Sequence, residues 1–525
     1  MTTNDRQTFI RAGGLQEPVE LSRQLYQTLC PSSVIDAETL ILIEVLRLHK
    51  ALDHTGSATG AAVLLRSLLQ PSTDLSYILS KQEALREIAS NDKLRQALQD
   101  FIHAYRSGES ALFKFFNKGL YALLPYPDLK RARRSAAHMA KMATTLPRPA
   151  SSYLGMLTAH LLAYKGSSVD RMMNGAIYKT FNGIQSDKDI GLFTPKQQFI
   201  PRRFSRWMAA GPAVALAPHL LEKAGYGPVS PVMPLIGLGW AGLYLFYSLL
   251  IKPVRDTGIF IEPFREKCVC DDAFIRAVDC VGMIDELLSL DCFAREMPHA
   301  TTLPQVKDDD FHCFEAFGLK NPVLAKERAD FVPNDIRMNG AKLTFISGPN
   351  SGGKTTICKS IVHNQLLAQI GGYVVAEKAA INIADRISYQ APKFDGLQDD
   401  EGRFGTELSR TRDIFYSTGP KSLVILDELA EGTTYEEKLH TAFGILSDFH
   451  AIGNNTVLVT HNHALVERLM EAGKGQCRQA EFIGDEPTYH LIPGVSRVAH
   501  AEKIAEKIHF GKADRKKYLK EKGYI

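Results

Sequence analysis

Apolar residues recur at three- and four-residue steps over much of the first third of the chain. The spacing is clearest in AETLILIEVLRLHKAL, DLSYILSKQEALREIA and KLRQALQDFIHAY, and it is typical of one face of an amphipathic helix. It predicts a mainly helical region over residues 36–165, followed by a Gly/Pro/polar stretch at 166–200. Amphipathic helix returns at 256–300, for example in AFIRAVDCVGMIDELLSL.

Residues 208–251 are far more apolar than the rest of the chain. No charged residue occurs from Ala224 to Ile251, and a helix over PVMPLIGLGWAGLYLFYSLLI (231–251) would be about 30 Å long, which is the thickness of a bilayer core. A shorter apolar stretch, MAAGPAVALAPHLL (208–221), precedes it. Together they predict a membrane hairpin; the alternative is a buried helical pair or an oligomer interface.

Basic residues flank this apolar segment on both sides. Arg202, Arg203 and Arg206 precede it, and Lys252 and Arg255 follow it. By the positive-inside rule both flanks, and therefore both soluble parts, face the cytoplasm. The N-terminal sequence MTTNDRQTFIRAGG has no apolar run behind a basic start, so no secretory signal is expected. We expect a cytoplasmic protein that is anchored to the cytoplasmic face of the membrane.

From about residue 311 the pattern changes to short β-rich runs that alternate with helices, which indicates a parallel α/β sheet. The predicted fold class is therefore α plus α/β, in several domains. The expected boundaries are an N-terminal extension at 1–35, a helical domain at 36–200, the apolar hairpin at 201–255, a helical return at 256–310, the α/β domain at 311–500 and a basic helical tail at 501–525.

Composition adds modest constraints. A chain of 525 residues is too long for one core, and 45% hydrophobic with 23% charged residues excludes wholesale disorder and a polytopic membrane protein. A net charge of +4 neither demands nor excludes nucleic acid. The eight cysteines lack paired CxxC spacing, which fits a reduced compartment and predicts no metal site among them.

The most specific motif is LTFISGPNSGGKTT, a strand at Leu343–Ile346 followed by a P-loop. Glycines let the backbone N–H groups surround phosphate oxygens, Lys354 neutralises the β- and γ-phosphates, and the Thr355 hydroxyl ligates Mg²⁺. ATP and Mg²⁺ are therefore the expected ligands. The candidate nucleotide-binding residues are Gly348, Pro349, Asn350, Ser351, Gly352, Gly353, Lys354, Thr355 and Thr356.

Two further strand ends carry candidate chemistry. In SLVILDELAEGTT the strand Leu423–Leu426 ends in Asp427, a candidate for holding Mg²⁺, and Glu428, a candidate for orienting or deprotonating the attacking water. The strand in NTVLVTHNHAL ends at Thr460, and His461 follows as a candidate to sense the γ-phosphate or polarise the water. The order predicts ATP hydrolysis and disfavours a small-molecule kinase, in which Glu428 has no role.

These motifs resemble those of the MutS family. GPNSGGKTT is similar to the family's GPNxxGKST, with Thr355 where Ser is usual, and DELAEGTTYEE, VTHNHAL and PGVSRVAHAEKIAEKI resemble its later ATPase elements. FVPNDI resembles the element beside the adenine, which makes Asn334 a nucleotide-pocket candidate. Residues 55–88 are similar to the start of the family's core domain. The resemblance implies an ABC-type ATPase domain, long lever helices and a homodimer whose partners complete each other's nucleotide sites.

Several departures from the family pattern bear on function. The sequence offers no room before the core for a mismatch-reading domain and no Phe-x-Glu wedge in its first thirty-five residues, so mismatch reading in the usual way is not expected. The family's Ser-Thr-Phe element that reaches the partner's γ-phosphate resembles QDDEGRFGTELSR, which keeps Phe404, Glu407 and Leu408 but has Gly402 and Arg403 in place of Ser-Thr. The apolar 208–251 segment falls where the family carries its DNA-clamp insertion.

Two basic segments could contact DNA phosphates or anionic headgroups, or form solvated helix faces. They are LKRARRSAAHMAKMA, with Lys130, Arg131, Arg133 and Arg134, and the tail GKADRKKYLKEKGY, with Lys512, Arg515, Lys516, Lys517 and Lys520. The leading hypothesis is a MutS-like, Mg²⁺-dependent ATPase with a membrane anchor, in which nucleotide binding closes a homodimer and moves helical levers that grip DNA. The alternative is a membrane-tethered, nucleotide-dependent scaffold that acts on a protein partner without DNA.

Overall fold

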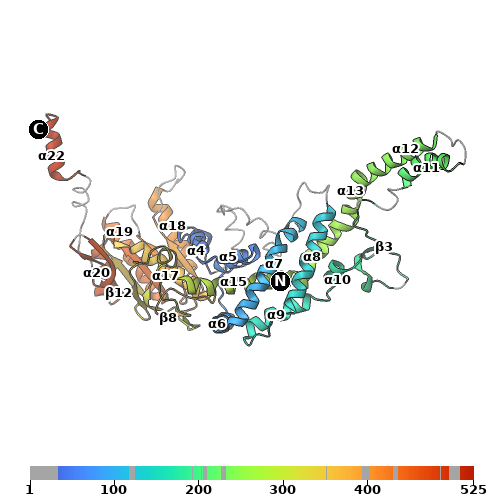
Figure 1. Cartoon of the computed structure of the whole chain (residues 1–525). Coiled ribbons are helices and arrows are strands. Elements are labelled where there is room, and N and C mark those ends of the chain that lie inside the picture. Colours follow the sequence, from blue (N-terminus) through green and yellow to red (C-terminus); the bar gives the residue numbers. More distant parts are fainter. Residues whose placement is uncertain are drawn as a thin grey trace. The chain divides into compact units, whose positions relative to one another are not determined.

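The computed structural model of this chain describes residues 34–116, 125–191, 193–202, 204, 210–225, 232–349, 352–392, 402–429, 435–484, 486–495 and 509–524. These residues divide into two compact units (Figure 1). Unit 1 contains His54–Leu64 and Arg86–Ser289. Unit 2 contains the described residues of Glu20–Asp53, Leu65–Leu85 and Leu290–Ile525. Each unit is described by itself.

Unit 1 is built mainly from helices, as the three- and four-residue apolar spacing predicts. In chain order they are the first part of α5 (Ala58–Leu69), α7 (Asp92–Phe116), α8 (Pro125–Ala143), α9 (Ser152–Tyr164), α10 (Ser168–Asn174), α14 (Glu262–Cys270) and most of α15 (Asp272–Glu296). Helices α7 and α8 lie side by side (Figure 1). Phe115 of α7 lies against Phe264 of α14, and these two rings are buried together with Phe274 of α15 in the interior of the unit.

Helix α15 packs against the start of α5 at very short range. A Cβ atom on Gly282 would lie 2.5 Å from Val63 Cγ2, so only glycine permits this approach. One turn further along α15, the buried Asp285 carboxylate accepts hydrogen bonds from the Gly56 and Ser57 amides at 2.9 and 2.8 Å, and from the Ser57 hydroxyl. The carboxylate therefore caps the segment that leads into α5. Burial raises the pKa of Asp285 to about 6, although these hydrogen bonds favour its charged form.

The stretch predicted as Gly/Pro/polar at 166–200 contains a small sheet that periodicity did not reveal. Strands β1 (Ile177–Thr180), β2 (Gly183–Ser186) and β3 (Gln197–Gln198) pair antiparallel in the order β2-β1-β3. Each strand has at most four residues, which is too short for alternation to stand out. Glycine at position 183, with φ of 98°, permits the tight turn between β1 and β2.

The apolar segment forms a helical hairpin in unit 1. Helix α11 (Ala210–Lys223) packs along α12 (Val232–Phe246), and the chain continues without a break through η4 (Tyr247–Ile251), α13 (Lys252–Asp256) and η5 (Thr257–Ile261) into α14. The continuous helix Val232–Cys270 is long and apolar enough to cross a membrane. Its most apolar window has a mean hydropathy of 1.6, and only 11% of that window is buried.

Unit 2 contains a six-stranded sheet in the order β13-β12-β7-β11-β10-β9. The five strands β12, β7, β11, β10 and β9 are parallel, as predicted, and β13 pairs antiparallel at the edge. The bounds are β7 Leu343–Ser347, β9 Ile387–Gln390, β10 Leu423–Asp427, β11 Asn455–Thr460, β12 Gln476–Ile483 and β13 Glu486–Pro493. A second sheet has the order β4-β8-β5-β6, with β4 Gln305–Lys307, β5 Phe314–Leu319, β6 Asn334–Met338 and β8 Lys378–Asn382.

Helices complete unit 2. Alternate strand residues such as Phe345, Leu426 and Leu458 share one hydrophobic cluster with Ile414 of α18, Phe449 of α19 and Leu465 of α20. The other helices lie against the rest of the unit. Their bounds are α3 Ala37–Leu42, α4 Val45–Leu52, α6 Leu75–Ser90, α16 Pro322–Glu327, α17 Lys354–Gln369, α18 Gly402–Tyr416, α19 Tyr435–Ile452, α20 His463–Glu471 and α22 Lys512–Glu521.

Helix α17, which follows the P-loop, is buried along nearly its whole length. Its buried polar side chains bond to backbone from several other segments: His363 Nε2 lies 2.7 Å from the Ile43 oxygen, and Asn364 bonds to the Lys320 oxygen and the Val375 amide. Gln369 reaches the carbonyl oxygens of Ser72 and Ala384. Because these polar partners lie on all sides, α17 shows no simple amphipathic pattern.

The compact units differ from the expected domain boundaries. Residues 36–53, 65–85 and 290–310 group with the α/β domain rather than with the helices of 86–289. The physical reason is contact with α17 and the sheet: α3 pairs with β9, and α4 packs on α16. Periodicity identifies a helix but does not show which sheet its buried face contacts, so the helical region looked continuous in sequence.

The raised pKa of Asp285 predicts a specific pH dependence of stability. A carboxyl whose pKa rises from 3.8 to about 6 on folding stabilises the fold most below pH 3.8, and that contribution is lost as the pH rises through about 6. Between pH 4 and pH 8 we expect the free energy of unfolding of wild type to fall relative to that of Asp285→Asn by about 2–3 kcal/mol. Urea denaturation followed by circular dichroism measures both; a constant difference across this range contradicts the assignment.

Candidate nucleotide-binding site

The predicted site residues lie at the carboxyl ends of three neighbouring parallel strands of unit 2. Strand β7 leads into the P-loop, β10 ends at Asp427, and β11 ends at Thr460. Strand β11 lies between the other two, with Val459 opposite Asp427 and Thr460 opposite Ser347. Because parallel strands end at the same edge of a sheet, three motifs separated by more than a hundred residues, from Gly348 to His461, meet in one place.

The P-loop packs against strand β12 and the neighbouring edge strand β13. A Cβ atom on Gly352 would lie 2.6 Å from Ala480 Cβ, and one on Gly348, whose φ is 130°, would lie 3.1 Å from the same atom. Gly353 has a φ of 78° and begins α17. Glycine is needed here for both close packing and left-handed backbone. The N-terminus of α17, with the backbone amides of its first turn, thus lies where phosphate binds in a P-loop.

Lys354 is held inside the loop. Its ammonium donates to the carbonyl oxygens of Gly348 at 2.6 Å and Pro349 at 2.9 Å, and the side chain is buried. Burial lowers the pKa of Lys354, while the carboxylates of Asp427 and Glu428 oppose that shift. The Lys354 ammonium thus lies beside the P-loop backbone, where it can neutralise phosphate charge. The nearby carboxylates of Asp427 and Glu428 favour its protonated form.

Thr355 and Asp427 form an oxygen pair suited to a hard cation. The Thr355 hydroxyl donates to Asp427 Oδ2 at 2.9 Å, and the Tyr389 hydroxyl donates to the same oxygen at 3.3 Å. Hydroxyl and carboxylate oxygens are typical Mg²⁺ ligands, and Mg²⁺ usually takes only one or two of them from the protein. The residues present therefore fit a magnesium ion. Tyr389 is 1% exposed, and burial raises its hydroxyl pKa, so it stays a donor.

Glu428 and His461 face each other next to this pair. His461 Nε2 lies 3.6 Å from Glu428 Oε1, and the two side chains are 41% and 22% exposed. Glu428 has a φ of 69°, an unfavourable region for a residue with a Cβ atom. Its amide donates to the Val459 oxygen at 2.9 Å, which fixes the backbone in that position. The strained turn directs a carboxylate into the site instead of continuing the strand.

Asn334 lies at the start of β6, where it bonds to strand β13. Its side-chain amide donates to the Tyr489 oxygen at 2.9 Å, and its side-chain oxygen accepts from the Leu491 amide at 2.7 Å. The ring of Tyr489 in turn lies against Gly353 of the P-loop. Asn334 thus connects the second sheet to the strand that supports the P-loop, and its predicted role beside the nucleotide base stays a prediction.

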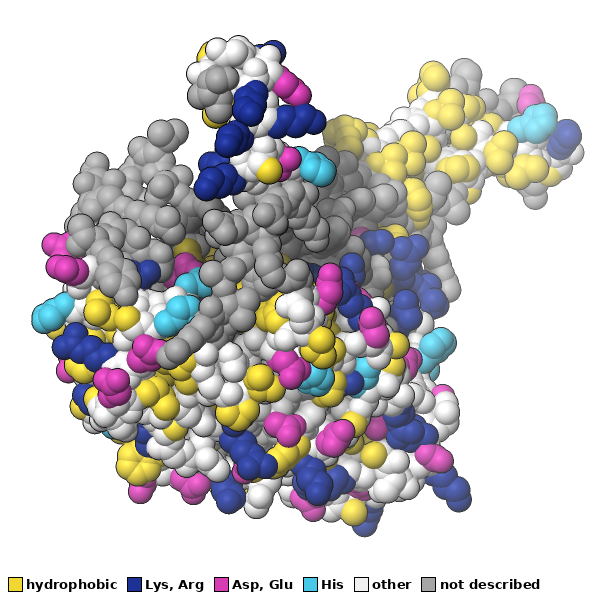
Figure 2. All heavy atoms as spheres, turned by 90° about the vertical axis from the view of Figure 1, so that its left-hand side faces the viewer, with side chains coloured by type: hydrophobic (Ala, Val, Ile, Leu, Met, Phe, Trp, Pro, Cys, Tyr) yellow, Lys and Arg dark blue, Asp and Glu magenta, His cyan; other side chains and the backbone are white. Residues whose placement is uncertain are grey.

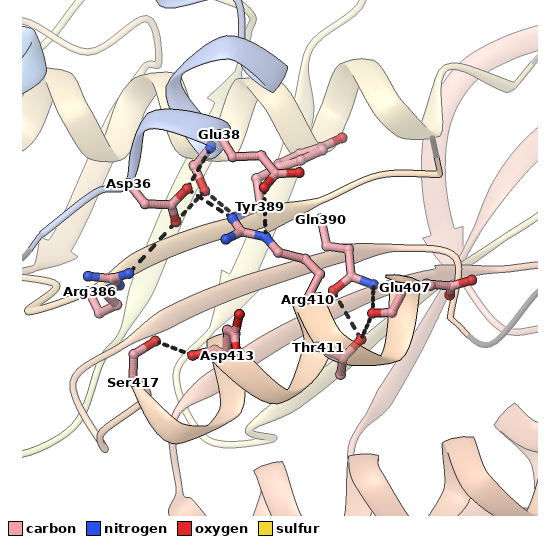
Figure 3. Close-up of polar contacts among 11 residues, drawn as sticks. Asp36, Glu38, Arg386, Tyr389, Gln390, Glu407, Arg410, Thr411, Asp413 and Ser417 are labelled. Carbon is pink, nitrogen blue, oxygen red and sulfur yellow. Dashed lines mark hydrogen bonds and ion pairs between the residues drawn. The ribbon is translucent and has the colours of Figure 1, made fainter. Parts of the chain in front are cut away.

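Helix α18 and strand β9 are joined to the N-terminal helix α3 by a polar network (Figure 3). Arg410 of α18 donates to Asp36 Oδ1 at 2.9 Å and lies 3.5 Å from Glu38. The Tyr389 amide donates to the Thr39 hydroxyl at 3.0 Å. Since the Tyr389 side chain reaches Asp427, residues 36–39 are linked through β9 to the candidate metal site. A chain separation of about 390 residues hides this link from sequence reasoning.

Some predicted residues cannot be placed. Asn350 and Ser351 lie outside the described residues, and nothing is described of the side chains of Gly402, Arg403 and Phe404. Thr356 lies in the first turn of α17, where its carbonyl accepts from Ser360. Sequence reasoning missed Tyr389 and Tyr489. The only available signal for Tyr389 was its place at the end of a short β-rich run, which is a common position for a buried aromatic residue.

Comparisons with known proteins agree with this geometry. Residues 344–495, which contain all three motifs, match the family model described as MutS domain V. The DNA mismatch repair protein MutS of Thermosynechococcus vestitus is 26% identical over 497 residues, 86% of this chain. The chain is thus similar to the MutS family, with the family model confined to the α/β part that carries the three motifs.

Other MutS relatives match over shorter segments. The DNA mismatch repair proteins MutS of Haloquadratum walsbyi and Acetivibrio thermocellus are 32% and 34% identical over 38% and 35% of this chain. The match covers 56% of the Thermosynechococcus protein and 21% and 22% of the other two. The chain therefore spans about half the length of the Thermosynechococcus protein. MutS family proteins are ATPases that use ATP with Mg²⁺.

The position of Lys354 predicts the effect of removing its charge. Lys354→Met keeps the apolar stem but loses the ammonium, so we expect ATP affinity to fall by about 10- to 100-fold, as for loss of one or two charge-assisted hydrogen bonds. Titration with a fluorescent ATP analogue measures the dissociation constant. Lys359→Met is the matched control, because Lys359 lies on the same helix and pairs with Glu44 at 3.2 Å. Equal affinity in Lys354→Met and wild type contradicts the role.

Proposed function

We propose that this chain binds and hydrolyses ATP at the site formed by the P-loop, Asp427, Glu428 and His461, and that hydrolysis drives conformational change in its helical levers. The observation that carries the proposal is the convergence of a lysine, a threonine and two acids at one sheet edge. Asp427 and Glu428 are consecutive, yet the backbone turn at Glu428 gives them different neighbours: Thr355 for the first and His461 for the second.

The two acids support different roles. Asp427 accepts hydrogen bonds from two hydroxyl groups, which hold its carboxylate in one orientation beside Thr355. Thr355 and Asp427 would hold Mg²⁺, which supplies charge neutralisation of the phosphate oxygens when bound. Lys354 and the amides at the start of α17 bind the phosphates. Since Thr355 and Asp427 are assigned to the metal and Lys354 to the phosphates, we assign proton transfer from the attacking water to Glu428.

Glu428 is the candidate general base. Its carboxylate lies beside His461, and its side chain is 22% exposed, so a water molecule can reach it. His461 Nε2 lies close enough to share that water or to contact the terminal phosphate. An acid positioned for proton transfer contributes about 10²- to 10⁴-fold to a rate. This arrangement supports separate roles for Lys354 in ATP binding and Glu428 in turnover.

Glu428→Gln tests this separation. The amide keeps the size of the side chain but cannot accept a proton, so we expect turnover to fall by about 10²- to 10⁴-fold while the ATP dissociation constant stays within about threefold. Steady-state phosphate release and nucleotide titration measure the two quantities. Glu471→Gln, an exposed acid on α20, controls for loss of surface charge and should behave as wild type. Unchanged turnover in Glu428→Gln removes the general-base assignment.

The proposed partners are DNA and a second copy of the chain. MutS family proteins bind DNA and form dimers, which motivates both proposals. The basic segments supply phosphate-binding groups unequally. On α8, Arg133 bonds to the carbonyl oxygens of Met173 and Gly175, whereas Lys130, Arg131 and Arg134 are exposed. On α22 all five predicted basic residues are exposed. DNA contact therefore depends mainly on the exposed cations, and mismatch reading in the usual way is not part of the proposal.

DNA-dependent turnover tests the first partner. We expect ATP hydrolysis by the detergent-solubilised protein to increase when duplex, branched or single-stranded DNA is added at low salt, and the increase to shrink at higher salt because phosphate contacts release counterions. Reversal of charge at two exposed positions, Lys516→Glu with Lys517→Glu, should weaken the effect; Arg133→Glu, which disrupts contacts within the protein, is not suitable. Equal rates with every DNA form at both salt concentrations contradict DNA binding.

The second candidate function is a membrane-tethered, nucleotide-dependent scaffold that acts on a protein partner without DNA. The specific observation in its favour is the exposed apolar hairpin formed by α11 and α12. If the protein is such a scaffold, DNA does not change the rate of ATP turnover. Glu428→Gln is still expected to lose turnover and to keep ATP binding. The DNA titration therefore separates the two candidates, while the tether itself requires separate evidence.

A further inference from the structure

The hairpin of α11 and α12 presents large apolar side chains to its surroundings along most of its length. Figure 2 shows hydrophobic side chains crowded over this part of the molecule. The most exposed are Leu243 at 71%, Leu235 at 69% and Leu238 at 65%. Others exposed by more than a third on the hairpin are Val214, Leu216, Leu220, Leu221, Val232, Met233, Ile236, Trp240, Leu245, Phe246, Leu250 and Ile251.

The exposed apolar positions of α12 surround the helix rather than forming one stripe. At 100° per residue they cover about two-thirds of its circumference. The remaining third faces α11, where Gly237 and Gly211 allow close approach: a Cβ atom on Gly237 would lie 2.5 Å from the Ala215 amide nitrogen. A protein groove covers one stripe of an amphipathic helix, whereas an environment that is apolar on all sides suits this distribution.

The length of the apolar run also fits a bilayer. Residues 232–251 form a continuous helix of α12 and η4 with no charged side chain. Their length of about 30 Å matches the hydrocarbon core. Helix α11 is shorter and carries Pro218 within it. Close packing through glycine and alanine, as between α11 and α12, is typical of helix pairs in lipid, where no hydrophobic effect drives the helices together.

A polar cluster ends the apolar run at the base of the hairpin. Lys252 donates to the carbonyl oxygen of Arg202 at 2.7 Å and to Asp256 at 2.9 Å, and Asp256 is also bonded by the Tyr126 hydroxyl. Arg202 and Arg255 are exposed at this level. The cluster attaches the hairpin to the body of unit 1 and places cations where anionic headgroups lie next to a hydrocarbon core.

We propose that the α11–α12 hairpin inserts into a lipid bilayer, with Trp240 near the middle of the hydrocarbon core and Lys252 and Arg255 at the headgroups. Trp240 lies about 12 Å from the start of α12 and about 17 Å from Ile251 along the helix. The occupant of the apolar surface is therefore lipid acyl chain. The inference is independent of ATP hydrolysis and of DNA binding.

The sequence provides a convenient probe of this insertion. The chain has two tryptophans, at positions 207 and 240, so Trp207→Phe leaves Trp240 as the only one. The full-length Trp207→Phe protein is reconstituted from detergent into phosphatidylcholine–phosphatidylglycerol vesicles whose acyl chains carry bromine either near the headgroup or near the chain end. Bromine quenches tryptophan fluorescence only at short range. We expect stronger quenching by the deep bromines, and protein that floats with vesicles after a wash at 1 M NaCl.

Substitutions within the hairpin test the same proposal. Leu238→Lys with Leu243→Lys replaces two of the most exposed leucines by charges, so it disturbs no buried contact but makes insertion unfavourable. We expect this protein to lose flotation and quenching and to remain soluble without detergent, with ATP binding retained. Leu162→Lys, at a 45% exposed leucine of α9 outside the hairpin, is the matched control and should still insert.

Three outcomes overturn the proposal. Stronger quenching by shallow bromines indicates a hairpin that lies on the surface. Release from vesicles by high salt indicates electrostatic adsorption through basic segments. Wild-type protein that stays soluble without detergent as a discrete oligomer, and becomes monomeric in the double leucine variant, identifies a second copy as the occupant. Glu428→Gln should insert like wild type, so failure of the proposed ATPase function leaves this result unaffected.

Discussion

Burial of α17 is the constraint on which the α/β unit depends. A P-loop needs a helix whose first turn is open to phosphate, but the rest of that helix here is enclosed by protein. Enclosure is tolerable only because its polar side chains bond to backbone groups of other segments: His363 to Ile43, Asn364 to Lys320 and Val375, and Gln369 to Ser72 and Ala384. The same bonds attach N-terminal helices to the nucleotide site, so the unit is assembled from three separate parts of the chain.

The backbone turn at Glu428 gives the consecutive residues Asp427 and Glu428 different neighbours, and therefore different candidate roles. Asp427 ends a strand in regular conformation, whereas Glu428 turns through a left-handed conformation and meets His461 instead. Asp427 is in turn oriented by Tyr389, whose backbone bonds to Thr39. Movement of the N-terminal helices relative to β9 would therefore change the orientation of Asp427 at the candidate metal site. These contacts physically link the N-terminal helix α3 to the candidate nucleotide site.

The two units differ in how much of their hydrophobic surface is exposed. Unit 2 encloses its hydrophobic residues within sheets and helices, and its functional groups are partly exposed at one sheet edge. Unit 1 encloses its aromatic core but leaves the hairpin's leucines outside. Water is a poor environment for that surface, and the cations at its base mark where a polar environment resumes. The proposed ATP hydrolysis and the proposed lipid insertion thus rest on separate parts of the chain and can be tested independently.

The sequence alone was enough to predict the P-loop, the strand ends at Asp427 and Thr460, the parallel sheet and the apolar hairpin, because each depends on local spacing and residue type. It could not show the β1–β3 sheet, whose strands are too short for a periodic signal, or the grouping of 36–53 with the α/β unit. Nor could it show Tyr389 beside Asp427 or Asn334 bonded to β13, since those contacts join residues far apart in the chain. Local patterns specify elements and motifs; tertiary packing decides which distant groups satisfy each other's hydrogen bonds.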